Sequence, residues 1–354
     1  MKAPLVFLTF NRPEATERGL HVIRQYRPNE LYLVSDGPRE GNACDQELVQ
    51  RTRDVLDSVD WPCTVVRDYS AVNLGAGRRV ASGLDNAFAA YEHAIVLEDD
   101  LVADDSFFSF CESMLERYAD DERVMHVNGS GYPLAKTPGG ASYRFSKLNL
   151  CWGWASWRRA WQRFQFDLGA LDRDLVMRRI DQAFPNNKQA NYWKNIFQYT
   201  HEHSHDIWDF QWVFAMTLHR GLAVTPTSNL VLNTGFTPEA TNTPTMPHWY
   251  ADMTLQSLSH AGALVHPRKV DVDWDYDTYV MNRVFLNRRS GIFFALDEAR
   301  RLAAVPARRL SKLGRRMGSA GVIGTAAALT ATQDAIEQSS TLLGLKRLVL
   351  SLPG

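Results

Sequence analysis

The N-terminal third of the chain alternates short apolar runs with longer segments whose apolar residues recur at helical spacing. The apolar runs, which have the character of buried strands, are residues 5–10, 31–35, 64–66, 94–97 and 124–127. The intervening segments that predict helices are residues 13–26, 46–59, 78–91 and a stretch beginning near Phe107. This alternation predicts an α/β fold, with a mainly parallel sheet, right-handed crossovers and flanking helices.

Capping residues indicate where two of these helices begin. Asn11 is suited to cap the first helix, with Pro13 in its first turn. Asp105 or Ser106 is suited to cap the helix near Phe107.

The rhythm changes after Gly129, where loops rich in glycine and proline replace the regular alternation. Residues 168–195 are polar and predict helices in several pieces. Residues 222–225 and 230–233 predict two late strands. The polar segment from Asn233 to Thr243 has the composition of a loop that closes over a ligand.

Three carboxylates, Glu98, Asp99 and Asp100, directly follow the apolar run at residues 94–97. They are thus expected at the carboxyl end of a strand, where open α/β sheets bind ligands. Hard oxygen ligands grouped in this way suit Mg²⁺ or Mn²⁺, and such an ion can hold a diphosphate. The alternative is a solvated acidic turn.

Tryptophan is concentrated in one short segment. Of the ten tryptophans in the chain, four lie close together, at Trp152, Trp154, Trp157 and Trp161. They form either a packing cluster or a wall for a sugar ring, since flat indoles match the apolar faces of sugars. Both interpretations hold if they apply to different members of the cluster.

Asp209 lies among large aromatic residues, between Trp208 and Phe210 at the start of a predicted helix over residues 210–220. Packed surroundings raise the pKa of a carboxylate and fix its position, which suits a general base. The alternative is a helix N-cap, a role open to Asp209 and to Asp206. Asp206 and Glu239 are the other candidates for the base.

Three further patterns carry less weight. Gly75 and Gly77 form a G-x-G without the third glycine of a dinucleotide-binding loop. The histidines at positions 201, 203 and 205 lack the spacing of the zinc hydrolases, and a polar loop is expected instead. Four aspartates at positions 271, 273, 275 and 277 alternate with other residues, which predicts a solvated acidic edge of a strand or extended loop.

Composition places the chain among soluble globular proteins, with 45% hydrophobic and 22% charged residues. A formal net charge of −1 argues against a nucleic-acid-binding protein. The four cysteines form neither a C-x-x-C pair nor a zinc pattern, and they are expected as reduced thiols in a cytoplasmic protein. The first apolar run is too short for a signal peptide, and no run reaches the length of a membrane span.

The charge is distributed unevenly along the chain. Residues 286–354 hold eleven Lys or Arg and four Asp or Glu, whereas residues 1–285 hold 28 basic and 36 acidic residues. We therefore expect a main segment that contains the candidate catalytic residues, residues 1–285, and a basic helical tail, residues 286–354. The tail suits either peripheral contact with anionic lipid at the inner face of the membrane or a helical cap on the core.

Several of these segments together resemble a glycosyltransferase of the GT-A fold. The likeness is closest to bacterial family-2-like transferases with an F-N-R-P start, some of them labelled haemolysin-like. Residues 97–108 are also similar to the metal-binding segment of the N-acetylglucosaminyltransferase I family. The segments that carry the resemblance are residues 9–13, 35–37, 73–75, 98–100, 151–157, 208–209 and 233–236.

The resemblance implies a role for most of the candidate site residues. Asp100 would bind the metal directly, and Glu98 and Asp99 would hold the donor sugar and ribose. Asp36 would contact the nucleotide base, alongside the backbone near Phe10 and Asn11. Asp209 would be the base. The remaining residues expected at the donor site are Arg12, Asn73 and Trp152.

One base and one Mn²⁺ or Mg²⁺ ion suffice for a single in-line displacement, which inverts the anomeric centre. The resemblance therefore implies an inverting, metal-dependent transfer from a nucleotide-diphosphate sugar to a glycan or lipid-linked hydroxyl. UDP-sugars are the usual donors in such families, which implies the same here. One rival is a sugar nucleotidyltransferase, although residues 11–14 lack the glycine of its phosphate loop. Another is a non-catalytic, membrane-associated protein of the same fold that uses the basic tail.

Overall fold

The computed structural model describes residues 2–132, 138–202, 207–236, 245–251, 253–258 and 264–286. Asp206, Glu239, His203, His205 and residues 241–243 lie outside the described residues, as does the tail beyond residue 286. The division into a main segment and a tail therefore stays a prediction.

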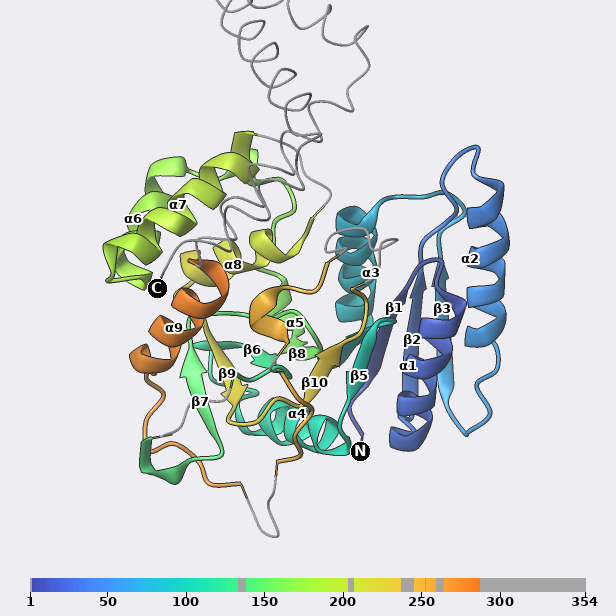
Figure 1. Cartoon of the computed structure of the whole chain (residues 1–354), viewed down its shortest axis with the longest axis horizontal. Helices are drawn as coiled ribbons and strands as arrows, with labels where there is room; N and C mark the ends of the chain where they lie inside the picture. Colours follow the sequence, from blue (N-terminus) through green and yellow to red (C-terminus); the bar gives the residue numbers. More distant parts are fainter. Residues whose placement is uncertain are drawn as a thin grey trace, which may run out of the picture. The chain divides into compact units, whose positions relative to one another are not determined.

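The core of the described chain is a mixed sheet of eight strands (Figure 1). The strands are β1 (Leu5–Thr9), β2 (Glu30–Ser35), β3 (Thr64–Tyr69), β4 (His93–Glu98), β6 (Val124–Asn128), β7 (Tyr143–Ser146), β8 (Trp154–Trp157) and β9 (Leu222–Pro226). Their order across the sheet is β3-β2-β1-β4-β8-β6-β9-β7. All pairs from β3 to β4 are parallel, as is β6 with β9, whereas β8 and β7 run antiparallel to their neighbours. A separate antiparallel pair joins β5 (Leu101–Ala103) to β10 (Val231–Asn233).

Helices cover both faces of the sheet. Successive side chains of a strand point to opposite faces, and apolar residues on both faces have to be covered. The α-helices are α1 (Pro13–Tyr26), α2 (Ala43–Leu56), α3 (Ala76–Ala90), α4 (Asp105–Arg117), α5 (Arg158–Trp161), α6 (Arg173–Ala183), α7 (Asn187–Glu202), α8 (Asp209–Leu218) and α9 (Trp274–Val280). Leu5 and Phe7 of β1 share a core with α1, α2 and α4, whereas Val6 and Leu8 share one with α3, α5 and α8. The predicted α/β fold, a mainly parallel sheet flanked by helices, is confirmed.

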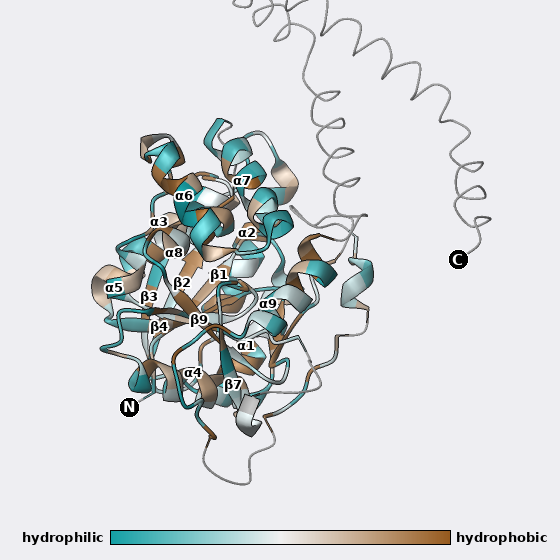
Figure 2. Ribbon diagram, turned by 90° about the vertical axis from the view of Figure 1, so that its left-hand side faces the viewer, coloured by the Kyte–Doolittle hydropathy of each residue, from teal (hydrophilic) through white to brown (hydrophobic). Residues whose placement is uncertain are grey.

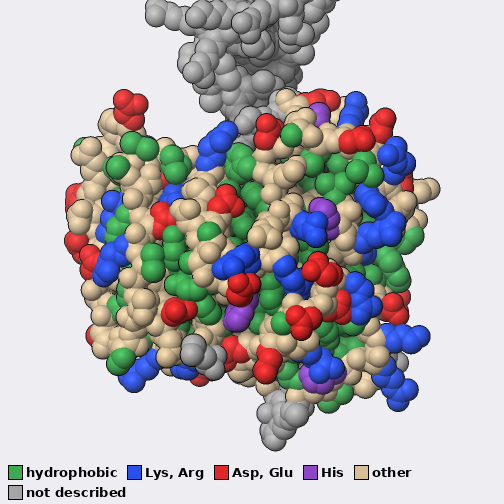
Figure 3. All heavy atoms as spheres, turned by 180° about the vertical axis from the view of Figure 1, so that it is seen from behind, with side chains coloured by type: hydrophobic (Ala, Val, Ile, Leu, Met, Phe, Trp, Pro, Cys, Tyr) green, Lys and Arg blue, Asp and Glu red, His purple; other side chains and the backbone are tan. Residues whose placement is uncertain are grey.

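A third apolar cluster joins α6, α7, α8 and α9 beside the sheet. The shorter helical turns are η1 (Pro138–Gly140), η2 (Leu168–Ala170), η3 (His248–Tyr250) and η4 (Met281–Phe285). In Figure 2 the central strands are largely hydrophobic, and the outer surfaces of the helices carry much of the polar colour. The face in Figure 3 mixes basic and acidic side chains. Within the described ranges, none of the helices combines the length and apolar character needed to cross a bilayer.

Both predicted helix caps are wrong by one residue. Arg12, not Asn11, occupies the N-cap position of α1, and Asn11 instead donates from Nδ2 to Asp45 Oδ1 at 2.8 Å. Asp104, rather than Asp105 or Ser106, caps α4, because its carboxylate accepts from the backbone N–H of Ser106 at 2.9 Å. In the first case the tertiary contact with α2 outcompetes the local cap.

The tryptophan cluster divides between the two interpretations. Trp154, Trp157 and Trp161 are 0%, 3% and 3% exposed, so they are packing residues of β8 and α5. Trp152 is half-buried and lies outside β8. Only this member of the four is therefore accessible to a ligand.

The acidic segment at residues 271–277 is not a solvated edge, and that prediction is wrong. Asp273 caps α9 by accepting from the backbone N–H of Tyr276 at 3.1 Å. Asp277 lies within α9, is 0% exposed, and accepts from the backbone N–H of Lys147 at 2.8 Å. Burial raises the pKa of Asp277 to about 7, although hydrogen bonds from Ser146 and Lys147 oppose the shift.

Replacing Asp277 by asparagine should make stability less dependent on pH. The folded pKa of about 7 lies above the ordinary value for Asp, so the folded state binds the extra proton between those two values. Asp277 therefore contributes stability at low pH that is lost as pH rises, by at most roughly 1.4 kcal/mol per pH unit. Denaturant unfolding at pH 5 and pH 8 should show that the free energy of unfolding of Asp277→Asn, relative to that of wild type, is higher at pH 8 than at pH 5. Equal differences at both pH values, as expected for the exposed control Asp275→Asn, would contradict this account.

Candidate functional site

The candidate site lies where the strand order of the sheet reverses. β1 pairs with β2 on one side and with β4 on the other, and ligands of open α/β sheets bind at the carboxyl ends of strands at such a point. The segment Phe10–Arg12 follows β1, and the acidic triplet begins at the last residue of β4. The backbone N–H of Asp99 donates to Leu8 O at 3.0 Å, which holds the two segments side by side.

Arg12 ion-pairs with the acidic triplet. Its Nη1 donates to Asp100 Oδ2 at 2.9 Å and lies 3.8 Å from Asp99 Oδ1. Burial raises the pKa of Asp99 to about 7, Arg12 opposes that shift, and the charge of Asp100 adds to it. The pKa of Glu98 is raised well above its usual range by burial and then by the charges of Asp100, Asp99 and Asp209. Burial and the neighbouring carboxylates therefore disfavour the charged forms of Glu98 and Asp99, and the single arginine does not offset this.

Asp209 joins the triplet from the other half of the chain. It is the first residue of α8, and Trp208 holds the N-cap position, so the N-cap interpretation of Asp209 is wrong. The Asp209 carboxylate accepts from the backbone N–H of Phe210 at 3.0 Å. Burial raises the pKa of Asp209, and its charge in turn raises that of Glu98. Asp209 of α8 is thus near enough to the triplet for its charge to act on Glu98.

The Asp100 carboxylate fits a divalent cation. Its Oδ2 accepts from Arg12, but its Oδ1 is buried and has no hydrogen-bond partner. A buried oxygen without a donor is costly, and a cation would satisfy it. In the part of the chain that the structure describes, no group of three His, Cys, Asp or Glu residues is arranged to hold a metal. Mg²⁺-type sites with one or two carboxylates are commonly completed by substrate phosphates.

The segment after β10 passes directly over Asp100. The backbone N–H and the hydroxyl of Thr234 donate to Asp100 O at 2.8 and 2.9 Å. At Gly235 an added Cβ would lie 2.1 Å from Asp100 Oδ2. The predicted ligand-closing loop therefore begins in contact with the expected metal ligand, and glycine is the residue that permits this approach.

Gly235→Ala should displace the Asp100 carboxylate, because the new methyl group would overlap it. We expect metal-dependent nucleotide binding to weaken by about tenfold or more, equivalent to about 1.4 kcal/mol. Titration calorimetry with UDP and Mn²⁺ measures this directly. Gly169→Ala is the matched control, since its Cβ would lie 3.1 Å from the Asp167 carboxylate outside the site. Unchanged affinity in Gly235→Ala would contradict the assignment of Asp100.

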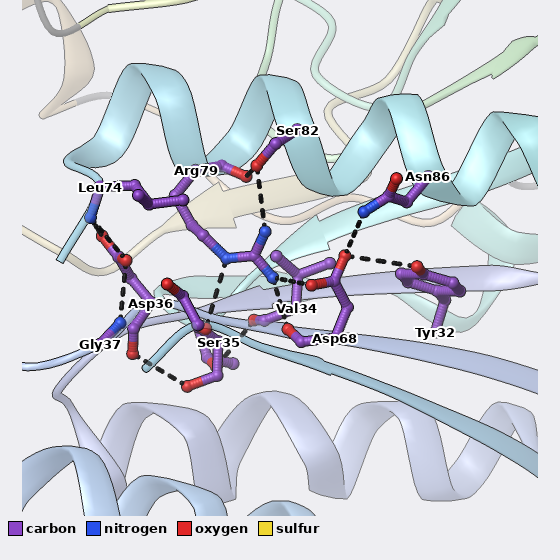
Figure 4. Close-up of polar contacts among 12 residues, drawn as sticks. Tyr32, Val34, Ser35, Asp36, Gly37, Asp68, Leu74, Arg79, Ser82 and Asn86 are labelled. Carbon is purple, nitrogen blue, oxygen red and sulfur yellow. Dashed lines mark hydrogen bonds and ion pairs between the residues drawn. The ribbon is translucent and has the colours of Figure 1, made fainter. Parts of the chain in front are cut away.

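Asp36 ties together two loops at the edge of the site (Figure 4). Its carboxylate accepts from the backbone N–H groups of Gly37, Leu74 and Gly75 at 2.8, 2.9 and 3.1 Å. Asn73 Nδ2 also donates to it, at 3.0 Å. Burial raises the pKa of Asp36, although these backbone N–H groups oppose the shift. The carboxylate is thus engaged within the protein, and its expected contact with a nucleotide base stays a prediction.

A buried arginine supports these loops, and the sequence analysis missed it. Arg79 of α3 is 4% exposed and pairs with Asp68 Oδ1 at 2.6 Å (Figure 4). It also donates from Nε to Ser35 O at 3.3 Å and from Nη1 to Ser82 Oγ at 3.1 Å. Arg79 therefore fixes α3 to the ends of β2 and β3. Its position in a helix with several charged residues gave no sign that it would be buried.

The remaining predicted donor-site residues lie around the same edge. Phe10 and Asn11 are half-buried, and the guanidinium of Arg39 lies 5.6 Å from the centre of the Phe10 ring. Trp152 is adjacent to Cys151, whose thiol pKa is raised by burial and then by the charges of Asp209, Glu98 and Asp100. The charges of the carboxylates thus act on the residue that precedes Trp152.

Comparisons with known proteins leave the activity open. No protein-family model and no curated protein sequence matches the chain. Its structure is similar to that of 4-diphosphocytidyl-2C-methyl-D-erythritol synthase from Anaerococcus prevotii, at 8% identity and a TM-score of 0.31, covering 65% of this chain and 92% of the other. It is also similar to mouse xyloside xylosyltransferase 1, at 11% identity and a TM-score of 0.31, covering 61% and 81%. Likenesses this distant do not bear on the activity of this chain.

Proposed function

We propose that the protein is an inverting, metal-dependent glycosyltransferase that moves a sugar from a nucleotide-diphosphate donor to a hydroxyl acceptor. The observation that carries the proposal is the acidic triplet at the end of β4, paired with Arg12 and with Asp100 Oδ1 buried and unpartnered, to which the nearby charge of Asp209 is coupled. The resemblance to GT-A glycosyltransferases supports UDP-sugar as the donor and a glycan or lipid-linked molecule as the acceptor.

The donor half of the site would be built on β1, β2 and β4. Asp100 would hold Mn²⁺ or Mg²⁺, and Arg12 lies beside it to bind the diphosphate. A bound divalent cation neutralises the charge that develops on the departing diphosphate. Glu98 and Asp99 would orient the donor sugar and ribose. The loops at Phe10, Asn11, Asp36 and Asn73 would hold the nucleoside.

Asp209 would act as the general base. Its carboxylate would take the proton of the acceptor hydroxyl while the acceptor oxygen forms a bond to C1 of the donor sugar. The bond from C1 to the diphosphate oxygen breaks in the same step, and its electron pair leaves with the nucleoside diphosphate. Attack opposite the leaving group inverts the anomeric centre. The half-buried position of Asp209 at the first turn of α8, with its carboxylate held by the backbone N–H of Phe210, supports this role.

A thermal-shift panel of nucleoside diphosphates, each with and without Mn²⁺, tests the donor half of the proposal. A ligand that binds only the folded state stabilises it by about 2.7 kcal/mol at one hundred times its dissociation constant. We expect at least one nucleoside diphosphate, with UDP favoured, to raise the melting temperature in the presence of Mn²⁺ and much less in EDTA. No shift with any nucleotide would contradict the proposal.

A further inference from the structure

Four aromatic side chains from three separate segments meet beside the carboxylates, and we call them the aromatic patch: Trp152, Phe236, Trp249 and Tyr250. The Trp152 ring centre lies 5.8 Å from that of Phe236 and 5.2 Å from that of Tyr250. The two indoles of Trp152 and Trp249 are stacked, with centres 6.0 Å apart and planes inclined by 19°. The sequence analysis expected Trp152 at the donor site, and its ring contacts with Phe236, Trp249 and Tyr250 place it instead in this cluster.

The aromatic patch borders Asp100 through the segment after β10. Trp152 follows Cys151, whose thiol pKa is raised by burial and then by the charges of Asp209, Glu98 and Asp100. Phe236 follows Gly235, the residue in contact with the Asp100 carboxylate. Tyr250 is 5% exposed, and its pKa is raised to about 12 by burial and, to a smaller extent, by Asp100. A ligand on the patch would therefore reach the groups proposed to carry the reaction.

The rings of the aromatic patch are held in place, and three of the four are only partly covered. The Tyr250 hydroxyl donates to Asn233 O at 3.0 Å. The ring centres of Trp249 and Tyr132 lie 5.7 Å apart, with the ring planes inclined by 62°. Trp152, Phe236 and Trp249 nevertheless remain half-exposed. This differs from Trp154, Trp157 and Trp161, which are buried packing residues. Core packing therefore accounts fully for those three tryptophans and for Tyr250, whereas Trp152 and Trp249 pack on the core and, like Phe236, keep part of their surface accessible.

We propose that the aromatic patch is the acceptor platform, on which Trp152 and Trp249 bind the apolar face of a pyranose ring. This inference rests on the proposed function and names its acceptor class as a saccharide, rather than a simple lipid or amino-acid hydroxyl. The C–H face of a pyranose loses water against flat rings, while its hydroxyl groups stay free at the ring edge. The loops expected to hold the nucleoside come from residues 10–75, and the patch comes from residues 152–250. Donor and acceptor would thus approach the carboxylates from different parts of the chain.

Saturation-transfer NMR on the full-length protein, with methyl glycosides of glucose, galactose and mannose as probes, tests the platform. We expect saturation of the ring C–H protons with wild type and none with glycerol, which lacks a ring. Trp249→Ala should reduce the transfer by roughly fivefold, and Trp249→Phe, which keeps a flat ring, should restore most of it. Trp274→Ala is the matched control, because Trp274 is 41% exposed and lies outside the patch.

The outcomes decide whether the aromatic patch binds a saccharide or only packs on the core. If none of the pyranosides receives saturation from the wild-type protein, or if folded Trp249→Ala binds them as well as wild type does, the acceptor platform is wrong. Circular dichroism of each variant establishes that it is folded. Nucleotide binding in the presence of Mn²⁺, measured on wild type in the same samples, reports separately on the proposed function. If the wild-type protein binds pyranosides but no nucleotide, and Trp249→Ala loses pyranoside binding, the saccharide site would be supported and the proposed transferase function would be wrong.

Discussion

Asp209→Asn should slow glycosyl transfer by roughly 10²- to 10⁴-fold, the usual contribution of a general base. Asparagine keeps the size of the side chain and can still accept from the backbone N–H of Phe210, but it cannot take the acceptor's proton. Nucleotide affinity should change little, because the base faces the acceptor and not the nucleotide. Turnover of the donor and calorimetric binding of the nucleoside diphosphate measure the two effects separately.

The pH profile and two control variants make the Asp209 prediction specific. Burial raises the pKa of Asp209, so wild-type turnover should rise with pH through a value above the ordinary range for Asp, and the variant should lose this dependence. Asp105→Asn removes a carboxylate from the first turn of α4, where it is exposed, and should retain full activity. If Asp206→Asn is the inactive variant instead, the base has been misplaced by three residues.

Asp100→Asn should abolish metal-dependent nucleotide binding while the protein stays folded. The neutral amide removes the charge that a divalent cation needs and places a donor where the cation would bind. Asp100 lies in the turn between β4 and β5 and not in an apolar core, so folding does not depend on its charge. We expect calorimetric affinity for UDP in the presence of Mn²⁺ to fall by at least about 10²-fold, equivalent to about 2.7 kcal/mol.

Asp60→Asn is the matched control for the loss of an ion-paired aspartate. Asp60 pairs with Arg24 at 2.9 Å, the same distance that separates Asp100 from Arg12, but on the surface. Its replacement should leave nucleotide affinity unchanged. Full turnover of Asp100→Asn, or of wild type in EDTA, would rule out the metal assignment.

The part of the site closest to the parallel strands could be predicted from sequence. Apolar runs mark β1 and β4, so the sequence places Arg12 and the triplet at Glu98 after two strands of one sheet. The pairing of β1 with β4, which brings them together, is seen only in the structure. Asp209 could be singled out because its aromatic neighbours indicate burial. These inferences depend only on short stretches of sequence and not on contacts between distant segments.

The remaining features depend on contacts between segments that are distant in the chain. β8 inserts antiparallel between β4 and β6, and nothing in the W-A-S-W segment specifies that position. The loops that engage the Asp36 carboxylate and the partners of Trp152 in the aromatic patch are set by tertiary packing. Asp277 showed the limit of periodicity, because alternating aspartates fit an extended strand but belong here to a helix.

The identity of the leaving group tests the central claim most directly. Wild-type protein would be incubated with a panel of nucleotide-diphosphate sugars and Mn²⁺, with water or a saccharide as acceptor, and the products separated by chromatography. A glycosyltransferase breaks the bond between C1 and the diphosphate, so the account predicts release of free nucleoside diphosphate, lost in Asp209→Asn. Formation of nucleoside triphosphate and sugar 1-phosphate when pyrophosphate is added, which indicates a nucleotidyltransferase, or no cleavage of any donor would contradict it.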